Sequence, residues 1–316
     1  MKRAPQCCAL STRDASTRRY PGNVVAMQFQ LVDVFTSAAY RGNSLTVFPD
    51  AGGLNSGQMA QITKELRQFE SIFLNPAGPQ RHWQAHIFDL FEELDFAGHP
   101  VLGAACVLHR QHAADEVRGR WTLELASGAL TVETERCGPG AFHAVLPDME
   151  AHFLGEPSGV SHAQVASWFS LIADDLDTRL PIEVVSTGLR YLIVPLRDGA
   201  LGRAGISHRE LDAALAEIGA QYAYLLDVDA QEGRHWNNDG AVEDAATGSA
   251  AGCVAAYLHR HGQLGDGQDA QLRQGRFIGR PSLMNISARS ADGEVRVKVG
   301  GEVVLVGSGR LDVLPS

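Results

Sequence analysis

Two stretches about 150 residues apart decide the fold: Glu243–His261, EDAATGSAAGCVAAYLHRH, and Asp95–Arg110, DFAGHPVLGAACVLHR. Each predicts a glycine-bearing turn that leads directly into a helix of Ala, Gly, Cys, Val and Leu. A helix that is apolar on nearly every side must be surrounded by the rest of the protein. Its first turn presents unpaired N–H groups at the positive end of the helix dipole, which suits a carboxylate or phosphate. Two such helix ends suggest two halves that share one anionic ligand.

The two stretches also indicate an internal duplication. Identical or related residues align at an offset of 150 residues: Gly98 with Gly248, His99 with Ser249, and Leu108–Arg110 with Leu258–Arg260. Residues 53–72 align with 205–224 at an offset of 152, and Val47 aligns with Val194 at an offset of 147. Three blocks in one order at nearly one offset are hard to produce by chance, so we predict two halves with the same fold.

Alternation of apolar and polar residues predicts strands on both sides of each helix. In the first half, a second helix is expected to begin at Asn55 or Ser56, with apolar residues at helical spacing as far as Phe69. Glu70 then stands where this helix gives way to a strand. Near the C-terminus, Ala291–Gly293 and Gly300–Gly301 are interpreted as turns between strands.

These elements predict an α+β fold of two pseudo-symmetric domains, each a β-barrel-like sheet wrapped around a central apolar helix. The first domain is expected to span residues 27–150 together with a C-terminal strand at about 308–316, and the second to span 151–307. Residues 1–26 are polar, Arg-bearing and without periodicity. They are interpreted as a disordered or upstream extension before a natural start at Met27, although a transit peptide has a similar composition.

Composition narrows the functional classes. The chain of 316 residues is 45% hydrophobic, carries a formal net charge of -10 and has a pI near 5.6. No apolar run reaches the roughly 20 residues that span a bilayer. No Lys/Arg block stands out, so neither nucleic acid nor a membrane is an expected partner. The five cysteines form no CxxC pair, which predicts no disulfide framework and no zinc site, and Cys106 and Cys253 are expected in the core. A reducing cytoplasm fits best.

The chemistry of a duplicated chain is expected where its copies differ. Glu70 aligns with Tyr222, so only the first half carries a carboxylate at the helix-to-strand junction. Glu70 could also be a solvated residue at a helix end. His99 aligns with Ser249 and lies between glycine and proline at a helix start. A histidine there is held in place for a ligand, and the helix dipole favours its neutral form.

The second helix start offers further candidates. Asp244 lies directly ahead of the turn and could be either catalytic or only an N-cap. Thr247, Gly248 and Ser249 could offer hydroxyl and N–H groups to a carboxylate without a metal.

The strings FAGHPVLGAA and EDAATGSAAG, joined to RGNS, RQFESIFL, VSTGLRYLIVPL and QGRFIGRPS, resemble the PhzF-like phenazine-biosynthesis family from Met27 nearly to the C-terminus. The paired GHP and ATGSA motifs are specific to it. The resemblance implies a fold like that of diaminopimelate epimerase, with two similar domains and an active site in the cleft between them. It also implies a homodimer.

The resemblance further implies proton transfer without a metal or cofactor. Glu70 would take a proton from carbon and return it elsewhere on a small carboxylate-bearing substrate, possibly cyclic, and His99 and Asp244 would position the substrate and relay protons. The substrate carboxylate would be held by four residues of the two helix starts and of the RGNS turn: Gly98, Gly248, Ser249 and, as a weaker candidate, Asn43.

This chain departs from the family pattern at three places that are expected along the cleft. The family prolines of FTP and EDPATGSA are Leu90 and Ala245 here, and an F-x-P segment is replaced by Trp236–Asn238. These changes leave the substrate open. Epimerisation, a lyase or hydrolase reaction in the same cleft, and a non-catalytic metabolite-binding protein are the alternatives.

Overall fold

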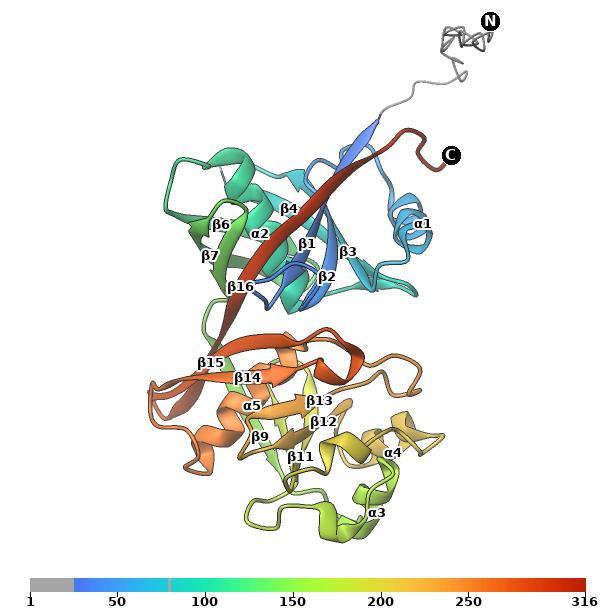
Figure 1. Cartoon of the computed structure of the whole chain (residues 1–316), viewed down its shortest axis with the longest axis vertical. Helices are drawn as coiled ribbons and strands as arrows, with labels where there is room; N and C mark the ends of the chain where they lie inside the picture. The colour runs from blue at the N-terminus through green and yellow to red at the C-terminus, as the bar shows by residue number, and fades with distance from the viewer. Residues whose placement is uncertain (1–25, 79–80) are drawn as a thin grey trace, which may run out of the picture.

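The computed structural model describes residues 26–78 and 81–316. It shows two lobes stacked along the long axis, with one long strand passing from one to the other (Figure 1). Except for Ala26, the predicted N-terminal extension lies outside the described residues. In the part that the structure describes, no helix is both long and apolar enough to cross a membrane.

Within the described chain, the first lobe is a closed barrel of eight strands. Seven of them come from the first half of the chain, and the eighth is the C-terminal part of β16, which pairs with β8 and β1. Parallel pairing joins β2 to β3 and β4 to β6, and the remaining neighbours are antiparallel. Its elements are β1 (Met27–Val34), β2 (Asn43–Phe48), α1 (Ser56–Leu66), β3 (Glu70–Pro76), β4 (His82–Asp89), β5 (Glu93–Leu94), α2 (Gly98–His112), β6 (Arg118–Leu125), β7 (Gly128–Gly138) and β8 (Ala141–Val145).

The second lobe repeats these pairings in the same order and sense from β10 to β16, and β9 pairs with both β10 and β16. Its elements are β9 (Met149–Gly155), α3 (His162–Trp168), η1 (Ala173–Asp175), β10 (Glu183–Ser186), β11 (Arg190–Leu196), η2 (Leu201–Arg203), α4 (Leu211–Glu217), β12 (Tyr222–Asp227), β13 (Glu232–Arg234), α5 (Gly248–Arg260), β14 (Asp269–Gln274), η3 (Arg276–Ile278), β15 (Ser282–Ala291) and β16 (Glu294–Leu311). The mixed α+β fold is as predicted, whereas the exact domain boundaries stay a prediction.

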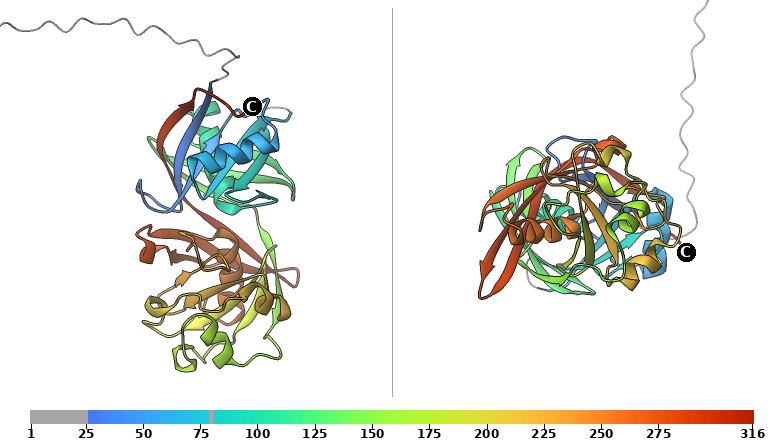
Figure 2. Two further views of the ribbon diagram at one scale, coloured as in Figure 1. Left: turned by 90° about the vertical axis from the view of Figure 1, so that its right-hand side faces the viewer. Right: turned by 90° about the horizontal axis from the view of Figure 1, so that it is seen from below.

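The two apolar helices are enclosed as predicted. All residues of α2 from Gly98 to His109 are buried, and the helix packs against β1, β2, β3, β6, β7, β8 and β16. Helix α5 is similarly buried among β9, β10, β11, β15 and β16. Cys106 and Cys253 lie in this core with no exposed surface. Because both helices begin on the sides of the barrels that face each other, their N-termini meet between the lobes (Figure 2).

The prediction of a turn at Gly300–Gly301 is wrong. Strand β16 runs through both glycines and changes partners there, because Gly300 pairs with β15 and Gly301 pairs with β8. A Cβ on Gly300 would lie 2.7 Å from the Ala144 carbonyl oxygen, and one on Gly301 would lie 2.7 Å from the Phe35 ring. The glycines therefore allow close packing where the strand passes between the lobes. The turn predicted at Ala291–Gly293 is confirmed between β15 and β16.

Helix α1 is shorter than the apolar spacing predicted. It begins after Asn55, whose side chain accepts from the Gln58 N–H, and ends at Leu66 because Arg67 takes a left-handed conformation with φ of 51°. Phe69 therefore lies outside the helix and lines the cleft between the lobes. Glu70 begins β3, as predicted.

The close packing of α2 on the barrel predicts the effect of one added methyl group. A Cβ at Gly103 would lie 2.6 Å from Leu45 Cδ2 and 3.0 Å from Val32 Cγ2. Gly103→Ala should therefore lower the free energy of unfolding by about 1–3 kcal/mol, measured by urea denaturation. Gly57→Ala, at an exposed position of α1, should lower it by no more than about 0.5 kcal/mol. Equal stability of the two variants would contradict this account of α2.

Candidate functional site

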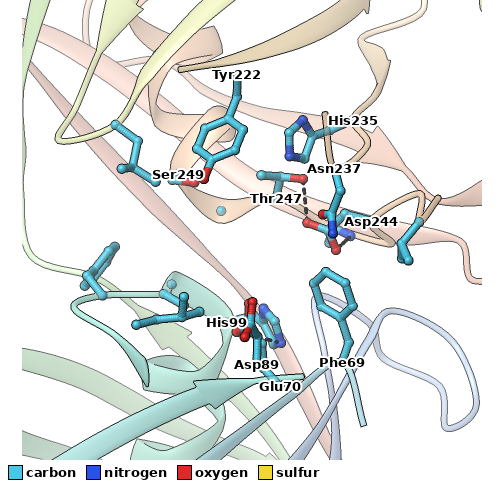
Figure 3. Close-up of a pocket in the computed structure, with 18 of the residues that line it drawn as sticks. Phe69, Glu70, Asp89, His99, Tyr222, His235, Asn237, Asp244, Thr247 and Ser249 are labelled. Carbon is cyan, nitrogen blue, oxygen red and sulfur yellow. Dashed lines mark hydrogen bonds and ion pairs between the residues drawn. The ribbon is translucent and has the colours of Figure 1, made fainter. Parts of the chain in front are cut away.

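A cleft of about 190 Å³ separates the lobes where α2 and α5 begin (Figure 3). The helix starts approach closely, because a Cβ built on Gly98 would lie only 3.7 Å from the Gly248 Cα atom. The N-cap residues are Ala97 and Thr247, and neither side chain accepts a bond from its helix. The first-turn N–H groups of both helices are consequently available to a ligand in the cleft.

Glu70 lies on the floor of the cleft, in register with Leu45 of β2 and Asp89 of β4. Only 8% of its surface is exposed, so the alternative of a solvated helix-end residue is wrong. Its Oε2 atom has no hydrogen-bond partner among the described residues. Burial, followed by the nearby charges of Asp244 and Asp89, raises the pKa of the Glu70 carboxyl well above its usual value.

His99 is the second residue of α2 and is 5% exposed. Its Nδ1 lies 3.3 Å from Asn43 Nδ2, which also donates to the carbonyl oxygen of Ala246 and to the carboxylate of Asp244. The two oxygens take both hydrogens of the amide, so the longer contact to Nδ1 is at most a shared hydrogen bond. Because an amide nitrogen cannot accept, we assign the proton of the neutral ring to Nε2. Nε2 lies 3.6 Å from Glu70 Oε2. Burial lowers the pKa of His99 to about 3.

Asp244 faces Glu70 from the second lobe, but it does not cap α5. The N-cap is Thr247, whose hydroxyl donates to Asp244 Oδ2 at 2.7 Å. Asn43 Nδ2 donates to Oδ1 at 2.8 Å across the lobes. Burial is the main cause that raises the pKa of Asp244, and nearby His235 opposes it. The site therefore places two carboxyl groups of raised pKa on opposite walls of one cleft.

The residues predicted to bind substrate lie in or beside the same cleft, but some of their polar groups are already bonded within the protein. Gly98, Thr247, Gly248 and Ser249 line the cleft. The Ser249 hydroxyl is 2.8 Å from the Tyr191 hydroxyl. Thr247 is already engaged, because its hydroxyl donates to Asp244 and its N–H donates to Gln274 Oε1.

Three polar residues around Asp244 are absent from the sequence prediction. Gln274 is fully enclosed and donates to the carbonyl oxygen of Asp244 and to the hydroxyl of Thr247. His235 lines the cleft and its Nδ1 donates to the carbonyl oxygen of Ala223 at 2.9 Å, which leaves Nε2 unprotonated in the neutral ring. Tyr191 holds Ser249. All three belong to strands or loops distant in sequence, so no local pattern indicates them.

The expected departures from the family pattern fall only partly on the cleft. Leu90 and Asn237 line it, and so does Asp89, which precedes Leu90. Ala245 does not line it, although both of its neighbours do, because the side chain is buried behind the loop. Among these departures, only Phe88–Asp89–Leu90, which stands in place of FTP, brings a charged side chain to the lining of the cleft.

Known proteins resemble this chain over most of its length. A family model described as phenazine biosynthesis-like protein matches residues 32–309. A trans-2,3-dihydro-3-hydroxyanthranilate isomerase of Pseudomonas chlororaphis is 34% identical over 291 residues, which cover 90% of this chain and 98% of the relative.

Solved structures of other proteins have the same fold over most of this chain. A protein of Pseudomonas aeruginosa described as a predicted epimerase has a TM-score of 0.84 and 46% identity, over 90% of this chain and 99% of that one. A hydroxyproline epimerase of Agrobacterium vitis, at 16% identity and a TM-score of 0.59 over 92% of each chain, shares the fold alone. With the cleft, its paired helix starts and the matched motifs in agreement, the chain belongs to the PhzF family of phenazine biosynthesis-like proteins.

Proposed function

We propose that this protein is a cofactor-independent isomerase that moves a proton on a small carboxylate-bearing, possibly cyclic, metabolite. The observation that carries the proposal is Glu70, a buried carboxyl group with one unpartnered oxygen in a cleft between two uncapped helix ends. A carbon acid needs a base beside its proton and positive potential for the charge that develops. Glu70 and the helix N-termini supply these two requirements.

The proton is conserved in the proposed reaction. The Glu70 carboxylate removes a proton from one substrate carbon, the electron pair moves into the conjugated system, and the resulting carboxylic acid returns the proton to another carbon. Its raised pKa favours this shuttling, because the protonated intermediate is less costly than at an exposed glutamate. His99 would donate from Nε2 to the substrate or to Glu70, since its Nδ1 faces the Asn43 amide nitrogen, which cannot accept.

The substrate carboxylate would be bound by the N–H groups at the starts of α2 and α5, with Gly98, Gly248 and the Ser249 hydroxyl closest to it. Asn43 and Thr247 are better suited to support, because their polar groups already hold Asp244. Asp244, fixed by these two residues, would orient a polar group of the substrate or relay its proton. No metal or cofactor has a part in this proposal.

Epimerisation in the same cleft is the alternative, favoured by the similarity to a protein described as a predicted epimerase. A mechanism with two thiols at the helix starts is not supported, because Cys106 and Cys253 lie inside the helices with no exposed surface. Product analysis separates the reactions, since an epimerase returns the proton to the same carbon.

Three further expectations belong to the proposal. The repeated order and sense of strand pairing in the two lobes supports an internal duplication. We also propose a cytoplasmic homodimer, as the family resemblance implies. Sedimentation equilibrium would test the dimer, and a single species at the mass of one chain would contradict it.

Proton NMR in D2O tests the central assignment. The protein is incubated with a panel of small amino and hydroxy acids that includes trans-2,3-dihydro-3-hydroxyanthranilate, the compound in the name of the P. chlororaphis relative. Deuterium should enter one C–H position of a substrate. Glu70→Gln should slow this exchange by a factor of at least roughly 10²–10⁴, because the amide cannot accept the proton.

Glu124→Gln, an exposed substitution on β6 outside the cleft, is the matched control and should retain full exchange. Thermal unfolding should show that the Glu70→Gln protein is folded. Exchange at an equal rate in wild type and Glu70→Gln would end the acid/base assignment.

The neutral His99 predicts a pH dependence of stability. Its pKa is about 3 in the native state and about 6.5 in the unfolded chain, so only the unfolded state gains a proton as the pH falls between these values. The wild type should therefore lose stability in this window by up to about 1.4 kcal/mol per pH unit from His99 alone. Above pH 6.5 this contribution does not change.

His99→Asn should remove that part of the loss, measured as the free energy of unfolding from pH 7 to pH 4. His162→Asn, at an exposed residue of α3, should follow the wild-type curve. If the free energy of unfolding changed equally with pH in wild type and His99→Asn, His99 would have the same pKa in the native and the unfolded state, and the account would be wrong.

A further inference from the structure

The cleft is lined by three carboxyl groups that no basic side chain of the lining can pair with, apart from two histidines. Its lining includes Glu70, Asp89 and Asp244 but no lysine or arginine. An adjoining chamber of about 570 Å³ shares Tyr222, Gly248 and Ser249 with it. This chamber also lacks a basic residue, and its lining contains Glu92, Glu93 and Asp95. The positive potential of the helix ends is thus confined to one side of a predominantly acidic space.

Most other buried carboxylates of the described chain pair with an arginine, although Asp227, at 5% exposed, accepts from the Ala230 N–H and has no ion-pair partner there. Five with side chains at most 8% exposed have an arginine nitrogen within 3.8 Å: Asp33, Asp177, Glu183, Glu232 and Glu243. No arginine or lysine of the described chain forms an ion pair with Glu70 or Asp244. An ionised carboxylate that is buried without a cation lowers the stability of the protein. A ligand that binds in the cleft would therefore stabilise it by supplying a positive charge.

Asp89 is the cleft carboxylate best arranged to receive such a charge. It ends β4 directly opposite Glu70. The N–H groups of Phe91 and Glu92 donate to its Oδ1 at 2.6 and 2.7 Å, which fixes the side chain. No hydrogen bond within the described chain engages its Oδ2. Like charges directly opposite on antiparallel strands repel each other, so this arrangement costs stability unless a ligand uses it.

Two polar atoms that face each other at 3.6 Å, just beyond hydrogen-bond distance, point to a ligand at this spot. Glu70 Oε2 and His99 Nε2 are buried without a hydrogen-bond partner in the described chain. Both lie beside Asp89 on the cleft floor (Figure 3). Such groups are normally satisfied, and here a bound molecule can satisfy them.

We propose that Asp89 determines specificity by binding a protonated amine of the substrate. The substrate class is then a small zwitterion, with its carboxylate on the two helix starts and its ammonium group at Asp89. This inference rests on the proposed function only in using the same cleft and carboxylate site. It does not require that Glu70 transfer a proton.

Calorimetric titration at pH 7 with two pairs of unreactive ligands tests the inference. One pair is 2-aminocyclohexanecarboxylate and 2-hydroxycyclohexanecarboxylate, and the other is 5-aminopentanoate and 5-hydroxypentanoate. Within each pair, an ammonium group in one ligand is replaced by a neutral hydroxyl group in the other. Wild type should bind the better amine at least roughly tenfold more tightly than its hydroxyl analogue, as expected for one charged hydrogen bond.

Asp89→Asn should reduce that preference by about tenfold and leave the affinity for the hydroxyl analogue unchanged or higher. The asparagine retains Oδ1 for the Phe91 and Glu92 N–H groups, so the loop should keep its shape. Glu124→Gln removes one exposed charge away from the cleft and should retain the wild-type preference.

Three outcomes would overturn the inference: an unchanged preference in Asp89→Asn, equal binding of amine and hydroxyl ligands by wild type, or no binding of any of the four. None of them depends on catalysis. Failure of the proposed function, in contrast, would appear as Glu70-independent exchange in D2O while the amine preference remained.

Discussion

A helix without a polar face can persist in water only if the protein encloses it, and this protein must enclose two. Strands surround α2 and α5 along their lengths. The helices end at the surface, where Arg110–His112 and Arg260 are exposed, whereas their starts meet between the lobes. The unpaired N–H groups of both helices consequently face one space. The cleft therefore follows from the placement of the two cores, because each helix starts where its lobe meets the other.

Asn43 connects this geometry to the chemistry. Its amide belongs to the first lobe and donates to Asp244 and Ala246 of the second, while the same nitrogen lies 3.3 Å from His99 Nδ1. One side chain therefore connects both walls of the cleft and also contacts the histidine that faces Glu70. Arg280 reinforces the same junction, since it binds Asp33 and the carbonyl oxygens of Arg41 and Gly42. A change in the relative position of the lobes would disturb all of these contacts together.

The electrostatic arrangement of the cleft is costly for the empty protein. Glu70 and Asp244 are buried without an arginine, and burial favours their neutral forms. The same burial keeps His99 neutral. Catalytic acid/base groups require such environments, because a carboxyl group with an ordinary pKa would hold a proton too briefly to return it. In the proposed reaction, this loss of stability is offset by groups that can exchange protons with a ligand.

Periodicity and composition determined much of this structure. The sequence of α2 has no continuous polar face from Gly98 to His109, so this helix had to be a core element, and the same holds for α5. The strand at Glu70 and the hairpin at Ala291–Gly293 followed from local patterns. Local patterns failed where long-range packing decided the outcome. Gly300–Gly301 resembled a turn, but Phe35 and Ala144 approach the backbone there and require glycine in a continuous strand.

The sequence by itself therefore determined which helices are buried, where they begin and which residues differ between the two halves. Only the tertiary structure decided that Phe69 and His235 line the cleft, that Thr247 rather than Asp244 occupies the N-cap position of α5, and that Gln274 supports the site. The physical reason is that burial of a helix depends on its own pattern of apolar residues. Contacts, charges and hydrogen bonds in the cleft depend instead on residues brought together from both lobes. The spacing of these residues along the chain does not indicate that they are close in space.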